Sequence, residues 1–239
     1  MANPMAAANL SAIRTGRKCE MRERSWKFPA QRGVAAGAIA MAVLCAAGLA
    51  GAQTAPVQPM GTTFGFAPLP PNPNATPGQI IDEVKAGVLA HDVGFLGHHI
   101  EHGPDVNLEM LFTSPDFLSI IGSPRPHIGG DINTAGATSD GFFGLTWGIS
   151  LIQNLFQPDD YVFATGSLGG AVHDGYELSA PDGHKRLGSP VLFRESAEIG
   201  YQITPTISVS AILDHISNAN LAPRNAGITS AGARVGVKF

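Results

Sequence analysis

A histidine and a serine stand two residues apart at the end of a segment in which apolar and polar residues alternate, Leu213-Asp214-His215-Ile216-Ser217. Residues i and i+2 of a strand lie on the same face, so His215 and Ser217 would be neighbours. A neutral imidazole can accept the proton of a serine hydroxyl while the serine attacks an ester carbonyl. The spacing is common, and a strand-end His and Ser bonded only to loop backbone would also explain it.

The face of the strand on which His215 and Ser217 lie limits the kind of substrate that they could reach. The odd-numbered residues before it, from Ile207 to Leu213, are all apolar, and His215 and Ser217 are odd-numbered too. Eight residues from Ile207 to His215 span ~26 Å along a strand. In a tilted membrane strand this becomes a depth of ~20 Å. The pair would then lie near the outer-leaflet interface, where polar groups are costly unless they have a function.

The N-terminal segment is typical of a secretory leader, with a basic stretch, a charge-free run over residues 34–50, and then Ala50-Gly51-Ala52. We expect residues 1–52 to be a removed signal peptide, with either Met1 or Met21 as the start. A membrane anchor is the alternative, although the run is shorter than the ~20 residues of a spanning helix. Residues 53–79 are rich in proline and are expected to form a periplasmic linker without strand periodicity.

The charge balance after the leader excludes one class of function. Residues 53–239 contain 8 Lys and Arg against 17 Asp and Glu, a net charge of about −9, whereas nucleic-acid binders carry a basic surface. Both cysteines, Cys19 and Cys45, lie in the leader, so no disulfide framework is expected. The remaining length suits one domain.

Residues 80–239 show eight segments of period two and no long amphipathic helix. Their approximate ranges are Ile80–Val93, Asp105–Ser114, Pro126–Thr134, Asp140–Ile152, Tyr161–Val172, Pro190–Ile203, Thr206–Ser217 and Ile228–Phe239. An even number of strands near ~10 residues long, with a charged and glycine-rich polar face, predicts an all-β fold: an eight-stranded antiparallel transmembrane β-barrel with both termini periplasmic. A soluble β-sandwich or lipocalin-like barrel is the alternative. Arg194, Glu198, Arg234 and Lys238 are expected to form ion pairs inside the barrel.

The sequence around the pair resembles a known family. His215-Ile216-Ser217-Asn218-Ala219, then Asn225-Ala226-Gly227-Ile228 and a last strand ending on Phe239, resembles the PagL-type lipid A 3-O-deacylases. The resemblance implies a serine esterase on the outer barrel surface that removes an ester-linked acyl chain from lipid A. It implies His215 as base and Ser217 as nucleophile, with Asn218 in the oxyanion region. Asn220 is a weaker oxyanion candidate.

The acidic member of the family's triad has no counterpart at its usual place. The family keeps an acid just after the Asn-x-Gly-hydrophobic turn, and this chain has Thr229 there. A hydroxyl can hold the His215 ring but cannot offset the charge of an imidazolium. If the hairpin before the pair turns at Pro205, Glu195 lies directly opposite His215 and is a substitute acid. A glutamate near the barrel rim, in contact with water, is the alternative.

The residues together with the resemblance predict an outer-membrane lipid A deacylase or a related acyloxyacyl hydrolase, whose partners are lipopolysaccharide of the outer leaflet and the membrane. The alternative is a catalytically inactive barrel of the same shape that binds lipopolysaccharide or has a structural role. No cofactor or metal is expected, because the cluster His98, His99, Glu101 and His102 is flanked by glycines and lacks the spacing of a zinc-binding helix. The oligomeric state, the acyl position and the chain length are left open.

Overall fold

The computed structural model describes residues 61–239, and the expected signal peptide lies outside this range. The described part contains nine strands and one short 3-10 helix. They are β1 (Thr63–Pro68), β2 (Ile81–Ala90), β3 (Pro104–Phe112), η1 (Asp116–Ile121), β4 (Arg125–Asn133), β5 (Asp140–Gln153), β6 (Tyr161–His173), β7 (Val191–Gln202), β8 (Ile207–Ser217) and β9 (Ile228–Lys238). No helix among residues 61–239 is both long and apolar enough to cross a membrane.

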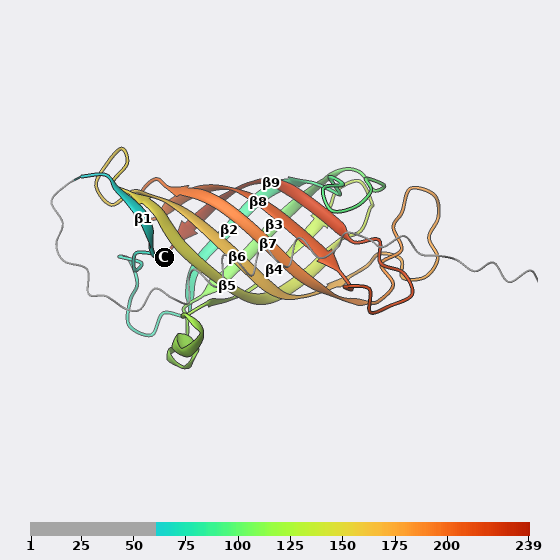
Figure 1. The fold of residues 1–239 in the computed structure, drawn as a ribbon, viewed down its shortest axis with the longest axis horizontal. Helices are drawn as coiled ribbons and strands as arrows, with labels where there is room; N and C mark the ends of the chain where they lie inside the picture. Colours follow the sequence, from blue (N-terminus) through green and yellow to red (C-terminus); the bar gives the residue numbers. More distant parts are fainter. Residues whose placement is uncertain (1–60) are drawn as a thin grey trace, which may run out of the picture. The chain divides into compact units, whose positions relative to one another are not determined.

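Strands β2 to β9 form a closed antiparallel barrel. Each strand pairs with its neighbours in the chain, and β9 pairs back with β2, which leaves no free edge around the eight strands. Figure 1 shows the strands tilted around a common axis. The predicted eight-stranded barrel is confirmed, and each predicted strand agrees with an observed one to within three residues at either end. The closed single sheet rules out the β-sandwich.

A short strand, β1, was not expected from the proline-rich sequence. Thr63 pairs with Gln153 and Pro68 with Ile149, at the end of β5, whereas β4 pairs only with the first half of β5, up to Thr146. The chain before the barrel therefore takes the place beside β5 that β4 leaves empty. The apolar residues Phe64 and Phe66 alternate with smaller ones in this strand, and both are exposed.

The barrel has a polar interior and an apolar exterior, as expected for a membrane barrel. Inside, Arg234 bonds to both Glu109 (2.5 Å) and Glu198 (2.7 Å), and Lys85 reaches the same Glu198 at 2.8 Å. Arg194 pairs with Asp214, while Lys238 donates to the Tyr161 hydroxyl at 2.6 Å. The outward side chains are large and apolar; among those exposed are Val88, Val106, Leu108, Ile128, Phe143, Phe193, Ile199, Val209 and Val235.

The two ends of the barrel differ in their connections (Figure 1). The C-terminus, β1 and η1 lie at one end, together with the turn between β7 and β8. The loops β2–β3, β4–β5, β6–β7 and β8–β9 lie at the opposite end, which we call the loop end. Strand β8 begins at the end that holds the C-terminus and finishes at the loop end. Its last residues, His215 and Ser217, therefore lie next to these loops.

Candidate active site

His215 and Ser217 face outward from β8, as the alternation predicted. Along this strand the even-numbered Ser208, Ile212, Asp214 and Ile216 are buried, whereas the odd-numbered residues are exposed or half-buried. His215 and Ser217 are both half-buried, at the loop end of the strand. Period two therefore places His215 and Ser217, the predicted base and nucleophile, on the same apolar face of the barrel, away from its interior.

The His215 ring is held by the next strand, β9. Its Nδ1 lies 2.8 Å from the Thr229 hydroxyl, and the two residues are direct register partners. Thr229 faces the same way as His215 but is only 2 % exposed, and its carbonyl accepts a bond from Val93 N in the β2–β3 loop. If Nδ1 donates its hydrogen to the Thr229 oxygen, Nε2 keeps a lone pair and can act as a base.

Glu195 lies on the other flank of His215, in the predicted register. Strand β7 pairs Glu195 directly with His215, and Glu195 is half-buried on the outward face. Among the hydrogen bonds of residues 61–239, none joins the two side chains. Thus the predicted pairing is confirmed, while the Nδ1 contact belongs to Thr229 and Glu195 is the neighbour of His215 on the other strand.

Ser217 is opposite Phe193 of β7, whose ring is exposed on the apolar surface. Within the described residues, no hydrogen bond links the Ser217 hydroxyl to His215. Catalytic contacts are often open without substrate and tighten in the complex, so this geometry is compatible with a base and a nucleophile. The two side chains share one face, with aliphatic and aromatic surface beside them.

The two predicted oxyanion residues are placed differently. Asn218 is even-numbered and points inward, with its amide bonded to the carbonyls of Leu187 and Arg224 and its backbone N–H to Asn225. It therefore joins the β6–β7 and β8–β9 loops and does not share the face of Ser217. Asn220 is exposed in the following tight turn, in which both Ala219 and Asn220 have positive φ.

Gly227, in the turn after β8, lies close to both His215 and Ser217, and no role was predicted for it from the sequence. A Cβ on Gly227 would lie 3.0 Å from His215 Cε1 and 3.1 Å from Ser217 Cβ. Both distances are shorter than ordinary van der Waals contact, so a side chain there would press on the pair. The backbone of the β8–β9 loop thus packs directly against His215 and Ser217, and its turn sequence Asn225-Ala226-Gly227 was the available signal.

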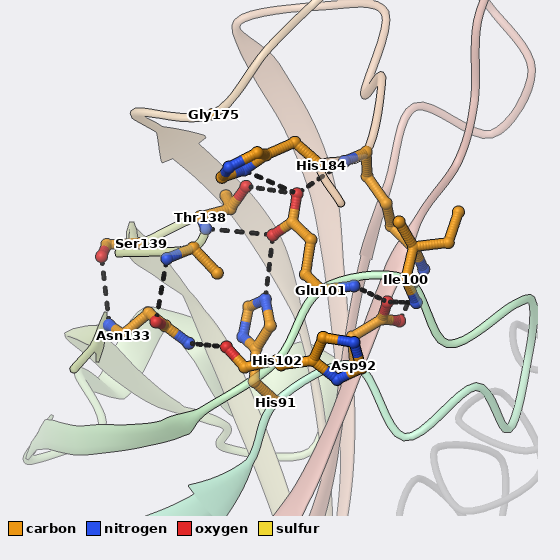
Figure 2. A network of polar contacts seen from close by, with 12 residues as sticks. His91, Asp92, Ile100, Glu101, His102, Asn133, Thr138, Ser139, Gly175 and His184 are labelled. Atoms are coloured by element: carbon orange, nitrogen blue, oxygen red, sulfur yellow. Dashed lines mark hydrogen bonds and ion pairs between the residues drawn. The ribbon is translucent and has the colours of Figure 1, made fainter. Parts of the chain in front are cut away.

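Behind the pair, a buried polar network joins the loops; we call His91, Asp92, Glu101, Thr138 and Lys185 the loop clasp. Glu101 accepts bonds from Thr138 N (3.0 Å) and Lys185 N (2.7 Å) and contacts His91 Nε2 at 3.1 Å. Figure 2 shows Glu101 between Thr138 and His91, with Asp92 beside it. The clasp therefore links the β2–β3, β4–β5 and β6–β7 loops.

Charges within the clasp shift two pKa values. Burial opposes protonation of His91, but its hydrogen bonds and charge contacts with Asp105 and Glu101 outweigh this and raise the His91 pKa to about 9. Burial would raise the pKa of Glu101, but bonds from His91, Lys185 and Thr138 lower it to about 2. Both groups are therefore charged at neutral pH. Within residues 61–239, no group of three or more His, Cys, Asp or Glu side chains is arranged to hold a metal ion.

One family model and several solved structures match this chain. A family model described as Lipid A 3-O-deacylase (PagL) matches residues 119–238, half of the chain. No curated protein matches the sequence. Among solved structures, the outer membrane enzyme PagL is 17 % identical with a TM-score of 0.49, covering 66 % of this chain and 99 % of that one.

Two other solved barrels are similar to this chain. Neisserial surface protein A (NspA) is 15 % identical with a TM-score of 0.39 and covers 66 % of this chain and 96 % of its own. The Yersinia pestis outer membrane protein Ail is 14 % identical with a TM-score of 0.35, covering 67 % and 100 %. By the family match, the chain belongs to the PagL family of lipid A 3-O-deacylases and is a β-barrel of the bacterial outer membrane.

Proposed function

We propose that the chain is a serine esterase that removes an ester-linked acyl chain from lipid A, with His215 as base and Ser217 as nucleophile. The observation that carries the proposal is the outward-facing position of both residues at the loop end of β8, with His215 Nδ1 held by Thr229. A nucleophile on the outer wall of a barrel meets lipid and not a soluble substrate, which suits an acyl ester of the outer leaflet.

The proposed reaction follows the chemistry of serine esterases. His215 Nε2 takes the proton of Ser217 while the serine oxygen bonds to the ester carbonyl carbon, and the resulting imidazolium returns the proton to the departing lipid A hydroxyl. Water then attacks the acyl-serine with His215 as base, releasing the fatty acid and restoring Ser217. Asn220, exposed after the nucleophile, is the better placed of the two predicted oxyanion donors, because the Asn218 amide is engaged.

Glu195 is proposed to act on His215 through its charge. A carboxylate directly across the strand pair would stabilise the imidazolium, which the Thr229 hydroxyl alone cannot do. Loss of the charge in Glu195→Gln is expected to lower kcat by about tenfold or more, since removal of the acid from a triad can cost several orders of magnitude. Full deacylase activity in Glu195→Gln would contradict this role.

An inactive barrel that binds lipopolysaccharide is the second candidate, and Thr229 favours it because the group that contacts Nδ1 carries no charge. Mass spectrometry of lipid A, from cells with and without the protein, separates the two. The esterase predicts loss of one acyl unit that disappears in Ser217→Ala. Ser210→Ala serves as the matched control, because Ser210 lies on the same strand but on its opposite, inward face, and this variant should stay active. Unchanged lipid A in the presence of a folded barrel would support the inactive candidate.

A further inference from the structure

Lys185, in the β6–β7 loop, has a buried ammonium group at the loop end. Its side chain is 2 % exposed, and Nζ lies 2.5 Å from Asp92 Oδ1 and donates to Gly227 O at 2.6 Å. A buried ammonium is costly in free energy unless it is paired and hydrogen-bonded, so the fold must keep Asp92 and Gly227 in contact with Lys185. The two acceptors belong to the β2–β3 and β8–β9 loops, and one side chain therefore joins three loops.

The residue that Lys185 holds is the one that packs against the catalytic pair. Gly227 offers its carbonyl to Lys185, while a Cβ on the same residue would fall within 3.1 Å of both His215 and Ser217. A displacement of the Gly227 backbone would therefore open or close the space into which these two side chains are packed. The contact from Lys185 to the pair runs through a single residue.

Lys185 is itself fixed at its backbone and at its counter-ion. Its N–H donates to Glu101 at 2.7 Å, and Asp92 Oδ2 accepts bonds from Ile100 N (2.8 Å) and Glu101 N (3.1 Å). Figure 2 shows Asp92 next to Ile100 in this network. Because the Lys185 backbone and the Asp92 carboxylate are both held by hydrogen bonds, the Lys185 ammonium can fix Gly227 relative to the other loops.

We propose that Lys185 is a positioning residue for the deacylation, which holds Gly227 and so keeps His215 and Ser217 in their reactive arrangement. The inference rests on the proposed function. Lys185 does not reach the lipid face, so its loss should affect the chemical step and not substrate binding. A misplacement of about 1 Å in a reacting group can cost about a hundredfold in rate.

The test compares Lys185→Met with wild type in kcat and KM for release of fatty acid from lipid A in detergent micelles. We expect kcat to fall by about 10- to 100-fold with little change in KM. Lys185→Arg, which keeps the charge and the donors, should recover part of the loss. Gly227→Ala should reproduce the kcat defect with Lys185 intact, because the added methyl group presses on the pair from the same side.

Lys85→Met is the matched control, since Lys85 is as buried (1 %) and forms a comparable ion pair with Glu198. Lys85 pairs with Gly236 and His215 with Thr229. The two sites are thus separated by seven residues of β9, or ~23 Å. Lys85→Met should lower the stability of the barrel without a selective loss of kcat. An equal kcat defect in both lysine variants would overturn the proposal, because it would show a general effect of removing a buried ion pair.

A second readout separates this inference from the proposed function. The Cε1–H signal of His215, assigned by its loss in His215→Gln, reports the ring environment by NMR whether or not the protein is active. We expect the signal to shift and broaden in Lys185→Met and to stay unchanged in Lys85→Met. If the wild type has no deacylase activity, the proposed function fails, and this signal alone decides the positioning role. An unchanged His215 signal in Lys185→Met would overturn it.

Discussion

At His215, the two neighbouring strands present different groups to one imidazole. Thr229 of β9 makes the 2.8 Å contact with Nδ1, and Glu195 of β7 lies directly across in register without a hydrogen bond to it. These groups would divide the work that a single carboxylate does in a Ser-His-Asp triad: orientation and tautomer by the hydroxyl, charge by the glutamate. The division follows from the position of His215 on the middle strand of three.

This division gives a prediction for Thr229. Thr229→Val keeps the shape but removes the oxygen, so His215 loses the partner that selects its tautomer, and kcat should fall by about 10- to 100-fold. Thr229→Ser keeps the oxygen and should retain most of the activity. Rates of fatty acid release measured side by side for the two variants check this. Equal rates for Val and Ser at position 229 would show that the hydroxyl does not orient the ring.

The alternation of odd- and even-numbered residues between the two faces of a strand made part of the site predictable from sequence. The alternation of β8 correctly predicted the outward face of His215 and Ser217, and the short Thr204-Pro205-Thr206 turn set the Glu195 register. Asn218 follows the strand and is buried, with its amide bonded to the Leu187 carbonyl, so its assignment to the oxyanion region stays a prediction. Lys185 carries no sequence signal, because its role depends on contacts with residues 42 and 93 positions away.

Among the elements, strands were more predictable than loops. Period two reports which side of a strand meets an apolar surface, and it gave all eight barrel strands to within a few residues. β1 was missed because prolines obscure its short alternation, and it is defined by its pairing with the end of β5. The loop clasp has no periodic pattern, since irregular backbone is held by individual side chains such as Glu101.

The loop clasp should respond to alkaline pH through His91. Its pKa is raised from 6.5 to about 9 in the fold, so the stabilisation from its charge is complete below pH 6.5 and is lost as the pH rises through 9. We expect the loops at this end to become more sensitive to protease between pH 7 and about 9.5, while the barrel strands stay protected. Limited proteolysis across this pH range measures it.

His91→Gln provides the control for this pH effect. The variant cannot gain or lose a proton at position 91, so its protease sensitivity should be raised already at neutral pH and should change little up to about pH 9.5. In addition, an NMR titration of the His91 ring should show a lower pKa in Asp105→Asn than in wild type, because the Asp105 charge and hydrogen bond raise it. Wild-type pH dependence in His91→Gln would assign the effect to another group.

In the barrel as a whole, charged groups are buried and apolar ones are exposed more than in a soluble protein. Charged pairs such as Arg234–Glu198 lie inside, beside a buried apolar cluster that includes Phe142 and Ile216, and exposed Val, Leu, Ile and Phe side chains cover the outside. The closed sheet leaves no backbone edge around the barrel for lipid to meet. A residue on the outer wall at the loop end, such as His215 or Ser217, would therefore meet lipid of one leaflet only.

The orientation of the barrel in the membrane decides which leaflet lies at the loop end. The predicted orientation, with periplasmic termini, can be tested with single cysteines. The native cysteines, Cys19 and Cys45, both precede the described residues, and each is replaced by serine in this experiment. Leu221→Cys lies in the β8–β9 loop at 79 % exposure, and Pro205→Cys lies in the exposed turn at the other end of β8. A membrane-impermeant maleimide should label Leu221→Cys in intact cells but should label Pro205→Cys only after the outer membrane is permeabilised. The reverse pattern would place Ser217 at the periplasmic leaflet, away from lipopolysaccharide, and would contradict a lipid A substrate.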